Sequence, residues 1–172
     1  VKNTLANAQA NRIEKLNAYS IWMWHLSLIC LTVRPLVGMP GLMKHYDPNA
    51  QLLYVHDKKT NSRKVGRPIP VTCYWQNHFN AYRKYLTQTI ELLDIKSLQA
   101  QLEREGLMLY VISHPRIKSK KDPVNLAEVV ENLELQPMSA DFVTNYLKET
   151  VQIYKNWPRH LTKNHLALSS DI

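Results

Sequence analysis

The segment 21–31 constrains the fold of this chain most, because it is apolar on nearly every side of the helix that it predicts. It forms the second half of an expected helix over residues 4–32, whose first half is polar. A membrane span needs roughly 20 apolar residues, about twice the length of this segment. Pro35 disfavours helical geometry in Arg34, so the helix should end there. The segment therefore predicts a buried helix at the centre of a globular core.

A small β-hairpin is expected to follow the helix. Residues 51–56 suit a strand, 57–62 a polar turn, and 64–71 a strand that returns beside the first. Pro68 and Pro70 lack the N–H group that an inner strand must donate, so the returning strand should lie at an edge of its sheet.

Further helices make up most of the remaining chain. A helix over residues 73–94 carries an apolar stripe at spacings of three and four, formed by Trp75, Phe79, Tyr82, Leu86, Ile90 and Leu93. The apolar run 107–112 suits a buried strand or an extended connection, and Ser139 suits the N-cap of a last long helix. We therefore expect one domain over residues 1–172 that is mainly α with a small β-hairpin, in the α+β class.

Composition limits the class of partner more than the class of fold. The chain has 172 residues and 45% apolar content, enough for one domain with a sizeable core. Its net charge of +8 favours a polyanionic partner, either nucleic acid or an anionic membrane surface. Two cysteines, Cys30 and Cys73, make neither a disulfide framework nor a zinc site, so a reducing cytoplasmic setting is expected.

Three basic residues lie in contexts that suit the binding of a phosphate. Arg34 follows the core helix, Lys58 lies in the hairpin turn, and Arg159 lies in the segment Asn156–His160. A guanidinium presents a planar fork of donors that matches a phosphate, and an ammonium can give a proton to a leaving oxygen. His160 can act as an acid, a base or a phosphate donor.

Each of these residues also has a structural alternative. Arg34 can stabilise the C-terminus of the helix before it, where a positive charge is favourable. Lys58 and Lys59 can be solvated residues of a hairpin turn, and His160 can be a hydrogen-bonded structural histidine.

Taken together, these segments resemble the catalytic domain of tyrosine recombinases, the phage-type integrases. Members carry an Arg after a core helix, here in Thr32–Pro35, and a Lys in a β-hairpin, here in Leu53–Lys58. They then carry Arg-x-Ile/Val-Pro, here Arg67–Pro70, and a second Arg, here in Asn156–His160. The Asn-Trp-x-Arg-His form of that last motif resembles integrases linked to mobile elements. The resemblance covers residues 5–172.

The resemblance implies phosphoryl transfer on DNA without a metal or a cofactor. A Tyr attacks the scissile phosphate, forms a 3′-phosphotyrosyl bond and releases a 5′-hydroxyl. Arg34 and Arg159 would stabilise charge on the phosphate, Lys58 would be the general acid, and Asn156 and His160 would support the phosphate or Arg159. Further contacts to DNA are expected from basic residues in the hairpin and in a later loop, namely Lys59, Arg63, Lys64, Arg67, Lys118, Lys120 and Lys121.

The sequence also departs from the family pattern. Asn156 stands where a His is usual, and an amide cannot transfer a proton. Residues 36–46 lack the acidic residue that often follows the first Arg, and neither the later Gly-His motif nor the nucleophilic Tyr is recognisable. Tyr54 falls on the expected strand, and Tyr82 and Tyr146 fall on inner faces of helices. We therefore expect a C-terminally truncated domain that binds DNA and is inactive by itself.

The expected partner is double-stranded DNA, with no membrane. The resemblance implies that the parent protein forms a tetramer on DNA and is cytoplasmic, prokaryotic and nucleoid-associated, whereas this chain should be a monomer or an incidental dimer. Two other classes of function remain open. One is a non-catalytic, basic helical module that binds nucleic acid, and the other is a protein-interaction domain whose basic charge has no such role.

Overall fold

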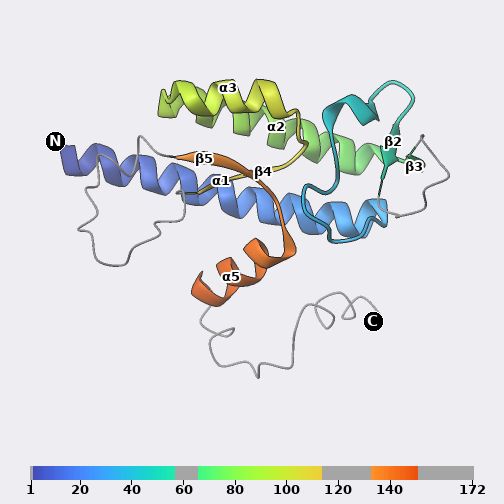
Figure 1. Cartoon of the computed structure of the whole chain (residues 1–172), viewed down its shortest axis with the longest axis horizontal. Helices are drawn as coiled ribbons and strands as arrows, with labels where there is room; N and C mark the ends of the chain where they lie inside the picture. Colours follow the sequence, from blue (N-terminus) through green and yellow to red (C-terminus); the bar gives the residue numbers. More distant parts are fainter. Residues whose placement is uncertain (1, 57–65, 114–132, 151–172) are drawn as a thin grey trace.

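A computed structural model of the chain describes residues 2–56, 66–113 and 133–150 (Figure 1). Its helices and strands are α1 (Lys2–Leu31), the 3₁₀ helix η1 (Met43–His45), β1 (Tyr46–Asp47), β2 (Leu52–Val55), β3 (Arg67–Pro70), α2 (Cys73–Leu93), α3 (Lys96–Glu105), β4 (Tyr110–Ser113), β5 (Glu134–Pro137) and α5 (Ala140–Thr150). The strands form one three-stranded and one two-stranded sheet. The expected α+β class is therefore confirmed, and the expectation of a single small hairpin is wrong.

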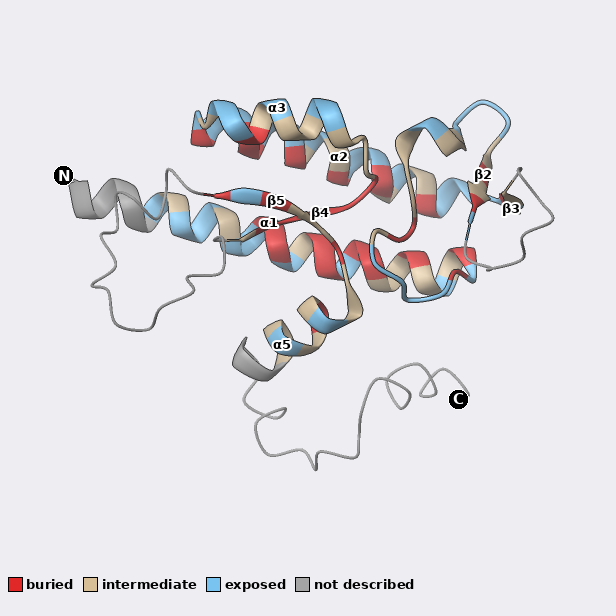
Figure 2. Cartoon of the chain, viewed as in Figure 1, coloured by how far each residue is buried: buried red, intermediate tan, exposed pale blue. Residues whose placement is uncertain are grey.

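The long helix α1 runs through the middle of the molecule, and the second half of it carries most of its buried residues (Figure 2). Met23 is fully buried there, and Trp24 is nearly so. Apolar residues on the outward side are not covered by the described elements, however, since Trp22 is 43% and Ile29 is 73% exposed. The prediction that this half is central to the core is thus confirmed, although the described elements cover only part of its circumference.

The helix α2 packs along α1 through the predicted apolar stripe. All six residues of that stripe are buried: Trp75, Phe79, Tyr82, Leu86, Ile90 and Leu93. The helix begins where the side chain of Thr72 accepts a hydrogen bond of 3.2 Å from the backbone N–H of Trp75. The indole N–H of Trp75 donates to the Ser27 hydroxyl at 2.9 Å, so a polar contact also joins the two helices.

The three-stranded antiparallel sheet has the order β1-β2-β3. In the pairing of β2 with β3, Leu52 lies opposite Pro70 and Val55 lies opposite Arg67. The strand that contains Pro68 and Pro70 is at an edge, as predicted, because a proline cannot donate to a further strand. The short strand β1 was not predicted, since its two residues carry no periodic pattern.

The apolar run 107–112 that suited a buried strand overlaps β4, which pairs antiparallel with β5. Both β5 and the helix α3 were missed from the sequence. The strand β5 reads Glu-Leu-Gln-Pro, and only its leucine, Leu135, is buried. The helix α3 likewise has one buried residue, Leu98. Neither segment shows enough apolar periodicity to be recognised without knowledge of its neighbours.

The last described helix, α5, begins as predicted. The Ser139 hydroxyl accepts a hydrogen bond of 3.1 Å from the backbone N–H of Phe142, which caps the helix. Val143 is buried, and Phe142 and Tyr146 pack against the core with their rings stacked 6.2 Å apart.

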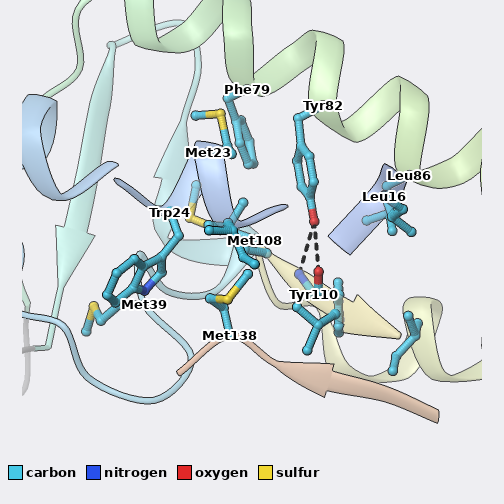
Figure 3. Close-up of a cluster of buried hydrophobic side chains, with 14 of the residues drawn as sticks. Leu16, Met23, Trp24, Met39, Phe79, Tyr82, Leu86, Met108, Tyr110 and Met138 are labelled. Atoms are coloured by element: carbon cyan, nitrogen blue, oxygen red, sulfur yellow. Dashed lines mark hydrogen bonds between the residues drawn. The ribbon is translucent and has the colours of Figure 1, made fainter. Parts of the chain in front are cut away.

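A buried tyrosine joins α1, α2 and β4 at the centre of the core (Figure 3). The Tyr82 hydroxyl donates to the backbone carbonyl of Tyr110 at 3.3 Å and accepts from its N–H at 3.1 Å. The Ser20 hydroxyl of α1 lies 3.1 Å from the same oxygen. From the next position of α2, Arg83 donates to the carbonyls of Leu107 and Met108 just before β4. These contacts fix the strand across the helix pair.

None of the helices, over the residues that the structure describes, combines the length and apolar character that a bilayer span requires.

Candidate nucleic-acid interface

Arg34 is presented on the surface by a loop whose backbone is held in place. The helix α1 ends at Leu31, and Thr32 has a positive φ of 49°, which turns the chain away from the helix axis. Val33 is buried, whereas Arg34 is exposed. Further along the loop, the N–H of Gly38 donates to the carbonyl of Met138 at 2.9 Å. The loop is thus anchored on both sides of an exposed guanidinium.

The alternative role of Arg34, as a charge at the end of the helix, finds less support. Its side chain makes no hydrogen bond or ion pair with the residues that the structure describes, and no basic residue lies in the last turn of α1. With respect to the described residues, the guanidinium is thus exposed and makes no polar contact.

The hairpin that was expected to carry Lys58 is formed by β2 and β3, which are antiparallel neighbours. Their pairing ends at Val55 and Arg67, so the chain between these residues closes the hairpin. Lys58, together with the predicted DNA-contacting residues Lys59, Arg63 and Lys64, belongs to segment 57–65, which lies outside the described residues.

Arg67 is the one predicted DNA-contacting residue that the structure describes. Its side chain is half-buried and lies on the same side of β3 as the buried Ile69, because alternate residues of a strand share a face. Pro68 and Pro70 occupy the exposed side. Arg67 is thus at the margin of the inner face of the sheet.

The remaining predicted site residues lie outside the described residues: Lys118, Lys120, Lys121, Asn156, Arg159 and His160. The convergence of Arg34, Lys58 and Arg159 on one phosphate therefore stays a prediction.

Two histidines that the sequence did not single out lie together beside the hairpin. The rings of His45, at the end of η1, and His56, directly after β2, have centroids 4.8 Å apart with planes tilted by 51°. They meet because β1 pairs with β2, which brings the residue before β1 next to the end of β2. The sequence contained a signal, since His45 follows Lys44 and lies eleven positions before His56, but the contact between the two rings depends on the unpredicted strand β1.

The environment of this histidine pair is electropositive. Burial lowers the pKa of His45, and the neighbouring charges of His56 and Lys44 lower it further. No carboxylate in the described part of the chain forms an ion pair with either ring. No third His, Cys, Asp or Glu there joins them in a group that could hold a metal ion. Among the described residues, the pair thus has cationic neighbours and no carboxylate in an ion pair with it.

Several of the described tyrosines do not suit the role of a nucleophile. Tyr82 is fully buried and hydrogen-bonded, and its burial raises the pKa of the phenol. Burial also raises the pKa of Tyr110 and Tyr146, and Tyr54 lies on β2. A raised pKa reduces the fraction of phenolate, which is the reactive form.

No family model, curated protein or solved structure matches this chain.

Proposed function

We propose that this chain belongs to a DNA breaking and rejoining enzyme of the tyrosine recombinase type and that it binds the phosphates of double-stranded DNA. The observation that carries the proposal is the order of two elements. An exposed Arg34 follows directly on the core helix α1, and an antiparallel hairpin whose closing segment contains Lys58 comes next. In the tyrosine recombinase pattern, the first catalytic Arg follows a core helix and the catalytic Lys lies in a β-hairpin, so these two elements are of the kind that the pattern requires.

The proposed chemistry is a transesterification at phosphorus. A tyrosine hydroxyl gives its proton to a base, a role that His160 can fill, and its oxygen bonds to the scissile phosphate while the bond from phosphorus to the 5′ oxygen breaks. Lys58 gives that oxygen its proton, so the products are a 3′-phosphotyrosyl bond and a 5′-hydroxyl. Arg34 and Arg159 donate to the non-bridging oxygens, whose charge grows as the transition state forms. Asn156 and His160 support the phosphate or the position of Arg159.

The net charge of +8 supports a polyanionic ligand, although it does not separate a recombinase from a plain DNA-binding module. The discriminating feature is the distance between Arg34 and Arg159. Two guanidinium groups that donate to one phosphate through hydrogen bonds of about 2.7–2.9 Å must lie within roughly 8 Å of each other.

This distance can be tested with spin labels at Arg34→Cys and Arg159→Cys in a background of Cys30→Ala and Cys73→Ser, with and without a short DNA duplex. We expect strong dipolar broadening of the electron paramagnetic resonance spectrum. The matched control pairs Arg34→Cys with Arg12→Cys, because roughly 30 Å of helix separates Arg12 from the end of α1. That control should show no broadening.

Binding of the duplex itself is measured by fluorescence anisotropy over a series of salt concentrations. DNA binding without broadening between positions 34 and 159 would favour the non-catalytic module. An absence of DNA binding at low salt would contradict both readings and leave the interaction domain.

A further inference from the structure

We propose that His45 and His56 form a second phosphate contact at the base of the β2–β3 hairpin, and that this contact binds a DNA backbone phosphate together with protons. The inference rests on the proposed function, since it adds two residues to the same DNA-binding surface and couples DNA binding there to the protonation of these residues. It goes beyond the motif residues, because neither histidine belongs to the motifs that suggested a recombinase.

The first argument is the placement of the two rings. His56 directly follows β2, and its ring lies against the backbone of Gly66, which directly precedes β3. A Cβ atom at Gly66 would stand 2.9 Å from Nε2 and 3.1 Å from Cδ2 of His56, so the absence of a side chain there makes room for the ring. His45 is held on the other side by η1, where its N–H donates to the carbonyl of Leu42 at 3.0 Å. The pair thus lies at the root of the hairpin that contains Lys58.

The second argument is the chemistry of two imidazoles at this separation. Protonation turns both nitrogens of each ring into donors, and two such rings 4.8 Å apart can donate to one phosphate group. Without an anion, two positive rings repel each other, which disfavours double protonation. A phosphate removes that repulsion and favours the charged form of both rings.

The third argument is the sign of the surrounding charge. Among the described residues, the elements around the pair carry the charged residues Lys44 of η1, Asp47 of β1, Arg67 of β3 and the Arg104–Glu105 ion pair at the end of α3, whose following residue Gly106 accepts from the N–H of Met43. Asp57, which follows His56 in the sequence, lies outside the described residues. The carboxylate of Asp47 already accepts from the N–H groups of Asn49 and Ala50 at 2.9 and 3.0 Å. Glu105 lies 3.4 Å from Arg104. Neither of these two carboxylates forms an ion pair with His45 or His56.

The linkage has a predictable size. Suppose that the bound phosphate raises the pKa of one imidazole by about one unit. The affinity for DNA is then about tenfold higher at a pH well below both pKa values of that ring, free and bound, than at a pH well above them. Two coupled imidazoles would give up to about a hundredfold. Because the pKa of His45 in the free chain is lowered, a rise of about one unit places the change for this ring below about pH 7.5 and lets it extend below the ordinary range of histidine.

Two measurements test the inference. The first follows the histidine ring signals of the unmodified chain by NMR over pH, in chloride, in inorganic phosphate and with a short DNA duplex. The signals of His45 and His56 are assigned with His45→Gln and His56→Gln. We expect the duplex to change the ring signals of both histidines and to raise the pKa of His45 above its lowered value in the free chain. A response to inorganic phosphate with none to the duplex would overturn the assignment to DNA.

The second measurement is duplex affinity over pH for the unmodified chain, for His45→Gln/His56→Gln and for the control His78→Gln on α2. His78 packs against Trp22 and Tyr74, so it tests whether any lost histidine has the same effect. The double variant should lose most of the pH dependence, and the control should keep it. Gly66→Ala keeps both histidines but displaces the His56 ring, so it should weaken the pH dependence of duplex affinity.

The outcomes separate this inference from the proposed function. DNA binding that is equally pH-dependent in the double variant would overturn the histidine contact and leave the proposed function standing. An absence of DNA binding at every pH would overturn the proposed function as well.

Discussion

The side-chain amide of Asn17 in α1 makes two hydrogen bonds with the backbone of Ile112 in β4, 95 positions further along the chain. Its Nδ2 donates to the carbonyl at 2.8 Å, and its Oδ1 accepts from the N–H at 2.9 Å. A side-chain amide also binds the backbone of β5, the other strand of this sheet: Oε1 of Gln101 in α3 accepts a hydrogen bond from the N–H of Leu135 at 2.7 Å. Side-chain amides from two helices thus satisfy backbone groups of a two-stranded sheet that would be marginal alone.

We predict that Asn17→Ala lowers the free energy of unfolding by about 2–4 kcal/mol, because it leaves a buried N–H and a buried carbonyl without partners. Urea unfolding followed by circular dichroism measures this loss. Asn11→Ala is the matched control, since Asn11 is exposed on the same helix, and it should change stability by less than about 0.5 kcal/mol. Equal effects of the two substitutions would show that the bonds to Ile112 do not stabilise the fold.

Tyr82→Phe should lower the free energy of unfolding by about 1–3 kcal/mol, although it keeps the aromatic ring. The lost hydroxyl leaves the N–H of Tyr110 and the hydroxyl of Ser20 without one of their partners in a fully buried site (Figure 3). Thermal unfolding compared with Tyr74→Phe checks this. Tyr74 is 59% exposed, so removal of its hydroxyl should change little. If Tyr82→Phe leaves the free energy of unfolding unchanged, the hydrogen bonds of the Tyr82 hydroxyl between α2 and β4 make no net contribution to stability.

The elements that the sequence predicted are those whose own residues carry the signal. The stripe from Trp75 to Leu93 defines α2 by itself, and Pro68 and Pro70 place β3 at an edge for a reason that does not depend on context. The strand β5 and the helix α3 contain one buried apolar residue each, so they form where β4 and α2 already provide a surface. Such dependence on distant neighbours cannot be read from a local pattern.

In the candidate site, too, the features that local sequence determines were predicted, and those that depend on distant neighbours were not. The end of α1 just before Arg34 was predicted from Pro35, and the hairpin whose closing segment contains Lys58 was predicted in type and approximate place. The histidine pair was not, because the contact between His45 and His56 depends on β1, which has only two residues and no periodicity. The predicted proximity of Arg34 to Arg159 involves long-range packing that no motif fixes.

The stability of the free chain should fall as the pH is lowered through the histidine range. The pKa of His45 is lowered in the folded chain by burial, by His56 and by Lys44, whereas an unfolded histidine titrates near about 6.5. The unfolded state therefore binds the proton first. This contribution to stability is complete above about pH 7.5 and is lost as the pH falls from the unfolded toward the folded pKa.

The pH effect is measured as the difference in melting temperature between about pH 7.5 and pH 5.5, a window set by the ordinary pKa of histidine. His45→Gln should reduce this difference, because glutamine does not titrate, and His78→Gln should leave more of it. A larger difference in His45→Gln than in the unmodified chain would contradict the sign argued here.

Arg34→Ala should weaken DNA binding by the same factor for unrelated duplex sequences, because a phosphate contact carries no base information. It should also reduce the slope of log affinity against log salt by about one, as expected for the loss of one phosphate contact. Arg12→Ala is the matched control, since it removes the same charge from an exposed position near the other end of α1. Fluorescence anisotropy with two duplexes over a range of salt concentrations measures both quantities. If the two substitutions weaken binding equally, the effect belongs to net charge and Arg34 is not a phosphate ligand. If only Arg34→Ala reduces the slope, the exposed guanidinium of Arg34 contacts a DNA phosphate directly.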